Sequence, residues 1–152
     1  MKKLIKNYTT DIPAPKTIAE IQALLGENGA SGVMAEYENG IIKHIFFKIK
    51  VKEKEMPFRL PARPEQVYNA LFKSLPGGWS KESRFYDGRW EKSVNIAWRI
   101  CKTWLEAQIT LINLQQAKME EIFLPYLVMP GNKTLFEVME TNQFLLSGKS
   151  EG

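Results

Sequence analysis

The sequence predicts an α+β fold, in which a three-stranded antiparallel β-meander packs on a long helix with two or three shorter helices. Residues 32–60 are rich in β-branched and aromatic residues and contain Asn39-Gly40, a pair that favours a type I′ hairpin turn. Residues 89–118 contain neither Gly nor Pro, and their apolar residues recur every three to four positions, as in a helix. Strands grouped together and followed by helices indicate an α+β domain.

The length of 152 residues suits a single domain. Residues 1–16 end in Ile12-Pro13-Ala14-Pro15 and are expected to form an N-terminal arm, residues 17–146 the α+β domain, and residues 147–152 a flexible tail. The N-terminal residues lack the apolar stretch of a signal peptide, and no apolar run reaches the roughly 20 residues of a membrane helix. We therefore expect a cytoplasmic protein without a membrane partner.

Capping signals and turn residues place the first helix. Thr17 and Glu20 have the spacing of a capping box, so the helix is expected to begin at Thr17. Gly26 or Gly29 would end it, because glycine readily takes the left-handed conformation that follows a helix.

The Asn39-Gly40 turn fixes an expected register for the meander. It would pair residue 38 with 41, 34 with 45, and Glu36 with Lys43, and a loop from Lys52 to Glu55 would follow. Strand alternation then sends one set of side chains to the core: Met34, Ile45, Phe47, Ile49, Val51, Met56, Phe58 and Leu60. The opposite face would carry Tyr37, His44, Phe46, Lys48, Lys50 and Arg59. Pro57 lacks a backbone N–H, so the third strand is expected at the sheet edge.

The second half of the chain reads as helices joined by irregular segments. Pro64 suits the first position of a helix over residues 65–74, and residues 75–88 form the longest expected loop. A short helical turn is expected over Glu120 to Leu124, and Pro125 to Pro130 should be extended. A turn at Gly131-Asn132 then precedes a last helix that opens with a second Thr-x-x-Glu capping box.

The first candidate site is the outward sheet face. Its cations, Lys48, Lys50 and Arg59, would neutralise phosphates. The rings interleaved with them, Tyr37, His44 and Phe46, would offer bases a stacking surface. The structural alternative is that helices cover this face near Phe46, while the lysines form a solvated rim.

The second candidate is a cationic stripe on the long helix. Arg99 and Lys102 lie three residues apart, and Trp98 could hold the Arg99 guanidinium by stacking. The stripe would bind phosphate or another acidic group. The alternative is a core helix whose tryptophans fill the centre of the domain and whose cations stay hydrated.

The third candidate is the loop over residues 75–88. Lys81 and Arg84 supply charge there, and Trp79 supplies an aromatic contact. The loop would contact nucleic acid or act as a lid, and a plain connection explains it equally well.

The composition excludes most familiar catalytic centres. A single His and a single Cys rule out two-His and multi-Cys metal motifs, and no nucleotide-binding glycine loop occurs. Asp occurs only at Asp11 and Asp87, so a two-metal nuclease would have to rely on Glu. We predict no metal and no cofactor, and the residues favour a non-enzymatic protein. An enzyme would need a cleft holding two or more carboxylates.

Several segments resemble small uncharacterised proteins of bacteriophages and integrated mobile elements. The segments are Lys16 to Ile21, Gly32 to Tyr37, Phe58 to Pro61, Ala97 to Trp104 and Phe123 to Tyr126. The resemblance spans about residues 16–140 and carries no catalytic signature or activity. It implies a virus-derived protein that acts in the bacterial host cytoplasm.

The favoured hypothesis is a nucleic-acid-binding accessory protein in which Lys48, Lys50, Arg59, Arg99 and Lys102 contact phosphate. The net charge of +4, from 21 Lys+Arg against 17 Asp+Glu, permits this but does not demand it. The alternative is a virus-encoded module, a counter-defence or regulatory inhibitor, that binds a host protein or a small anionic ligand through the same cations. The sequence leaves the oligomeric state open.

Overall fold

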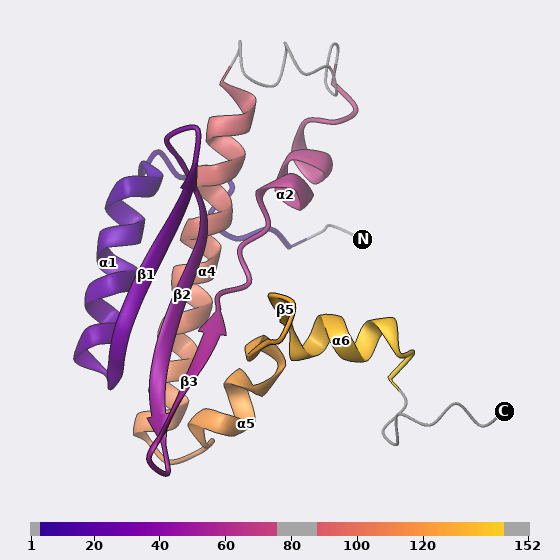
Figure 1. Ribbon diagram of the computed structural model, residues 1–152. Helices are drawn as coiled ribbons and strands as arrows, with labels where there is room; N and C mark the ends of the chain where they lie inside the picture. Colours follow the sequence, from indigo (N-terminus) through magenta and orange to yellow (C-terminus); the bar gives the residue numbers. More distant parts are fainter. Residues whose placement is uncertain (1–3, 76–87, 145–152) are drawn as a thin grey trace, which may run out of the picture.

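The α+β class is confirmed by the computed structural model, which describes residues 4–75 and 88–144. Strands β1 (Ala30–Glu38), β2 (Ile41–Val51) and β3 (Lys54–Arg59) form an antiparallel sheet in the order β1-β2-β3. Helices α1 (Ala14–Glu27) and α4 (Arg89–Asn113) pack together against one face of the sheet (Figure 1). The short helix α2 (Pro64–Leu71) packs on α4.

The remaining described elements follow α4 and lie along the β3 edge of the sheet (Figure 1). They are helix α5 (Met119–Phe123), the 3-10 turn η1 (Leu124–Tyr126), strands β4 (Val128–Met129) and β5 (Lys133–Thr134), and helix α6 (Leu135–Thr141). An isolated bridge between Phe58 and Leu127 connects them to β3.

The core forms where the inner sheet face meets α4, as the sequence predicts. Phe47 and Phe58 are buried and stack with ring centroids 5.4 Å apart, and Phe123 meets Phe47 edge-on at 5.3 Å. From α4, Trp98 and Leu105 are fully buried. The structural interpretation of Trp98 as a core residue is therefore correct.

The two hairpin turns have the backbone that their residues favour. Asn39 (φ 53°) and Gly40 (φ 77°) both adopt positive φ, which confirms the predicted turn. Lys52 (φ 49°) and Glu53 (φ 73°) do the same, so the second turn has two residues instead of the expected loop. Pro57 lies on an edge strand of the sheet, as expected.

A β-bulge changes the expected register of the first hairpin. The pairing shifts after Glu36, which therefore lies opposite His44. Because a shift by one residue exchanges the two faces of a strand, Met34 points outward with 56% of its surface exposed. Val33 and Ala35 pack against the core in its place. The prediction that Met34 is a core residue is wrong.

The same bulge overturns two further expectations. Tyr37 pairs with the buried Ile42, so it lies on the helix-facing side of the sheet and not on the outward face. The expected cross-strand pair of Glu36 with Lys43 does not form, and the Lys43 ammonium lies 3.3 Å from the Glu38 carboxylate instead.

Helix α1 begins at Ala14, three residues before the predicted start at Thr17. Pro13 takes the N-cap position, and the free backbone N–H of Ala14 donates to Asn95 Oδ1 of α4 at 2.8 Å. Thr17 is consequently buried within the helix, and Glu20 is available for contacts with α4 instead of a capping box.

The later helices follow their sequence signals more closely. Pro64 opens α2, which ends at Leu71, and α4 begins at Arg89 and ends five residues earlier than expected. Thr134 caps α6 in the predicted capping box, and the positive φ angles of Gly131 and Asn132 confirm the turn before it. The segment after Pro125 includes a 3-10 turn and is only partly extended.

Candidate functional site: the outward sheet face

No helix among the described residues covers the outward face of β1 and β2. Figure 1 shows these strands with α4 behind them and open space in front. Along β2 this face carries His44, Phe46, Lys48 and Lys50 in succession. The exposed Met34 of β1 lies opposite Phe46. Phe46 itself is only partly exposed, and its cross-strand neighbour Arg59 is held by α6, whereas Lys48 and Lys50 are exposed.

Two rings and two ammonium groups dominate this face. The rings of His44 and Phe46 meet edge-on, with centroids 5.7 Å apart. The Lys48 side chain is 59% exposed and only approaches Glu55, at 4.0 Å, while Lys50 is also exposed. An exposed pair at such a distance contributes little stability, so both ammonium groups can meet an anion at low cost.

His44 is held neutral by its surroundings. Partial burial lowers its pKa first, and the nearby Arg59 charge lowers it further, whereas Glu36 acts in the opposite direction. At neutral pH the ring is therefore an uncharged aromatic surface that can stack on a base or donate a hydrogen bond.

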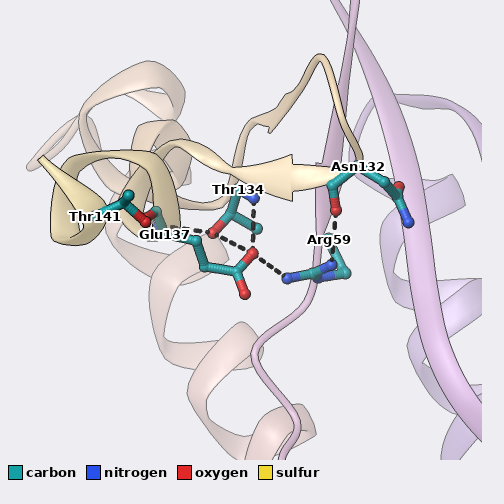
Figure 2. A network of polar contacts seen from close by, with 5 residues as sticks. All are labelled: Arg59, Asn132, Thr134, Glu137 and Thr141. Carbon is teal, nitrogen blue, oxygen red and sulfur yellow. Dashed lines mark hydrogen bonds and ion pairs between the residues drawn. The ribbon is translucent and has the colours of Figure 1, made fainter.

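Arg59 belongs to the same face but is occupied by the C-terminal elements (Figure 2). Its guanidinium lies 2.5 Å from Glu137 Oε1 and donates to the backbone carbonyl of Asn132 at 3.3 Å. Glu137 also accepts from the backbone N–H and hydroxyl of Thr134, at 2.8 and 3.1 Å. Hydrogen bonding by the Thr134 backbone, followed by the Arg59 charge, keeps the pKa of Glu137 below the ordinary carboxyl range despite some burial. Arg59 thus connects β3 to α6 and is not a free phosphate ligand.

The cationic stripe of α4 is neutralised by one carboxylate of α1. Arg99 Nη1 and Lys102 Nζ each lie 2.9 Å from Glu20 Oε2, and Lys102 also lies 3.7 Å from Glu106. The hydrogen bond from Lys102 is the main reason that the pKa of Glu20 is lowered. Both cations are largely covered, so the stripe connects two helices and presents no open anion site.

The N-terminal segment also uses a cation of α4. Lys92 Nζ donates to the Thr10 carbonyl at 2.5 Å and lies 3.4 Å from Asp11, while Asn7 donates to Thr103 at 3.2 Å. These contacts hold the arm against α4 and leave it outside the sheet face.

The third candidate site lies outside the described residues. Trp79, Lys81 and Arg84 fall in residues 76–87, so their contribution stays a prediction.

The described residues offer no assembled metal centre. Residues 4–75 and 88–144 contain no group of three or more His, Cys, Asp or Glu side chains placed to hold a metal ion. Cys101 is buried in α4, and burial raises the pKa of its thiol to about 12, which suppresses its nucleophilic form. Within the same residues, no helix has the length and apolar character needed to cross a membrane.

Comparison with protein-family models, with curated proteins and with solved structures finds no match to this chain. The case for a function therefore depends on the chemistry of the outward face.

Proposed function

We propose that this protein is a non-enzymatic nucleic-acid-binding accessory protein, and that its ligand is a single strand lying across the outward sheet face. One observation carries the proposal. The uncovered face of β1 and β2 places the rings of His44 and Phe46 in line with the exposed ammonium groups of Lys48 and Lys50. Unpaired bases stack on aromatic rings, and lysines neutralise the backbone that joins the bases.

The proposed contact set is narrower than the one expected from the sequence. Lys48, Lys50, Phe46 and His44 remain in it, joined by the exposed Met34. The proposed contact set excludes three cations that internal carboxylates hold, namely Arg59, Arg99 and Lys102. The phage or mobile-element origin and the bacterial cytoplasm as the site of action stay predictions.

The first test measures binding of a labelled single-stranded oligonucleotide by fluorescence anisotropy at several salt concentrations. We expect affinity to fall as salt rises, and the double variant Lys48→Gln/Lys50→Gln to reduce the logarithmic salt slope by about 1.4, or about 0.7 for each lost phosphate contact. Phe46→Leu keeps an apolar strand residue but removes the ring, and should weaken binding by about tenfold.

The matched control is Lys6→Gln/Lys16→Gln, which removes the same charge from the arm and α1, away from the sheet face. The control should leave the salt slope nearly unchanged. Absence of binding at low salt, or an equal effect of the two double variants, would show that the face is not a nucleic-acid site. Retention of a host protein from nuclease-treated lysate would then favour the protein-binding alternative.

A further inference from the structure

A hollow of about 530 Å³ lies between the β1–β2 turn and the start of α2. Residues of the turn form one wall, residues 62–66 form the other, and Trp90 of α4 contributes to the lining. Its volume falls in the range of small-molecule sites, which is roughly 300–1,000 Å³. The lining consists of Glu38, Asn39, Ile41, Ile42, Lys43, His44, Ala62, Arg63, Pro64, Glu65, Gln66 and Trp90.

The lining chemistry suits a neutral, flat ligand with a polar edge. Two cations, Lys43 and Arg63, are balanced by the carboxylates of Glu38 and Glu65, so the hollow does not favour a multiply charged phosphate. Apolar groups and the Trp90 indole supply a surface for an aromatic ring, and the polar side chains supply donors and acceptors. A nucleobase has this combination of properties.

The hollow and the proposed nucleic-acid surface have one residue in common. His44 lines the hollow and also stands beside Phe46 on the outward face. A strand that stacks one base on Phe46 would therefore bring a neighbouring base to the mouth of the hollow. The geometry points to a nucleoside site: the hollow takes one unstacked nucleoside of the bound strand. This inference rests on the proposed function, and it adds recognition of one base to contact with the backbone.

The same ligand chemistry is available as a free nucleoside or as a base within a strand, so the experiment has an arm for each. In the first arm, adenosine, guanosine, cytidine and uridine are titrated into the ¹⁵N-labelled protein, with ribose 5-phosphate as the base-free probe. We expect at least one nucleoside to shift the amide signals of residues 38–44 and 62–66, and ribose 5-phosphate to leave them unchanged. If no nucleoside shifts these signals, the inference is wrong.

In the second arm, Gln66→Trp fills the hollow with an indole, and Gln116→Trp places the same side chain on an exposed turn after α4. We expect Gln66→Trp to weaken binding of the oligonucleotide by about tenfold, and Gln116→Trp to have no such effect. An oligonucleotide that lacks the base entering the hollow should lose binding affinity by about the same factor. An abasic site at any other position should weaken binding less.

The outcomes separate the two proposals. Suppose that the oligonucleotide binds through Lys48 and Lys50, but Gln66→Trp and Gln116→Trp bind it with equal affinity. The nucleoside site is then wrong, and the proposed nucleic-acid surface is still supported. If nucleosides bind in the hollow but no oligonucleotide binds the face, the proposed function fails and the hollow is a site for a free nucleoside.

Discussion

At the residue scale, three buried side-chain atoms lack a hydrogen-bond partner among the described residues, on Thr17, Asn69 and Trp98, and Thr17 and Trp98 are fully buried residues. The hydroxyl of Thr17 in α1 and the indole N–H of Trp98 in α4 are both completely covered, and neither makes a hydrogen bond there. A buried polar group without a partner costs about 1–3 kcal/mol. Both groups therefore mark positions where the core is less stable than its apolar packing alone would allow.

Thr17→Val tests this cost directly. Valine keeps the β-branched shape and removes the hydroxyl, so we expect the free energy of unfolding to rise by about 1 kcal/mol. Urea unfolding followed by circular dichroism measures the change. Thr110→Val is the control, since that hydroxyl is exposed and donates to the Glu106 carbonyl at 2.8 Å. A fall in stability for Thr17→Val would mean that the hydroxyl is satisfied in solution.

At the element scale, the capping box of α6 is combined with an ion pair to β3. Helix α6 has no buried residue of its own and packs mainly on η1, β4 and β5. The bonds that Glu137 makes to Thr134 and Arg59 therefore hold the beginning of α6 against the sheet edge (Figure 2).

Glu137→Gln should release this helix. The neutral amide loses the ion pair and weakens the cap, so we expect backbone amides of α6 to exchange with solvent about tenfold faster. Hydrogen exchange followed by NMR or mass spectrometry gives the rates. Glu140→Gln changes the same charge on an exposed position of the same helix and should leave them near the native values. Equal effects of both variants would argue against the Arg59 contact as the anchor.

Elements also differ in how well their structure can be predicted from the sequence. The turns at Asn39-Gly40 and Gly131-Asn132, the edge position of Pro57 and the cap at Thr134 were all predictable, because each depends on local backbone chemistry. The outward orientation of Met34 was not predictable, because a bulge inserts one residue into a strand without any strong signal in the sequence.

The site was predicted only in part for a related reason. Lys48, Lys50 and Phe46 could be placed on one face from strand alternation alone. The ion-pair partners of the two arginines could not be predicted from the sequence. Glu137 lies 78 positions from Arg59, and Glu20 lies 79 positions from Arg99. The sequence pattern places Glu20 in a helix cap, and only tertiary packing turns it toward α4.

At the scale of the whole molecule, some of the cations form internal ion pairs that connect elements of the fold, and others are exposed on the surface. Glu20 connects α1 to α4, and Glu137 connects α6 to β3, so two carboxylates hold three of the cations expected at a binding site. The cations left over on the outward face, Lys48 and Lys50, come from one strand. The binding face is thus defined as much by where charge is neutralised as by where it is exposed.

This division predicts an acid-sensitive fold. Glu20 and Glu137 both have lowered pKa values, so the folded state binds fewer protons than the unfolded chain. Their contribution to the free energy of unfolding is therefore fully present above about pH 4.5. It should be lost as the pH falls through their lowered pKa values. Urea midpoints measured from about pH 6 to about pH 3 should decline, and Glu20→Gln should decline less steeply than the native protein. The exposed Glu27→Gln should follow the native curve. Parallel curves for all three proteins would contradict the role of Glu20.

The burial of Cys101 has a practical consequence for handling the protein and for measuring its motions. It is the only thiol in the chain, and in the folded state it is 97% shielded from solvent. Two copies cannot become covalently linked through this sulfur unless α4 first separates from its neighbours. A thiol reagent that reacts faster than the open state closes will therefore modify the protein at the rate at which the core around Cys101 opens. A single native side chain thus reports conformational opening without an attached label.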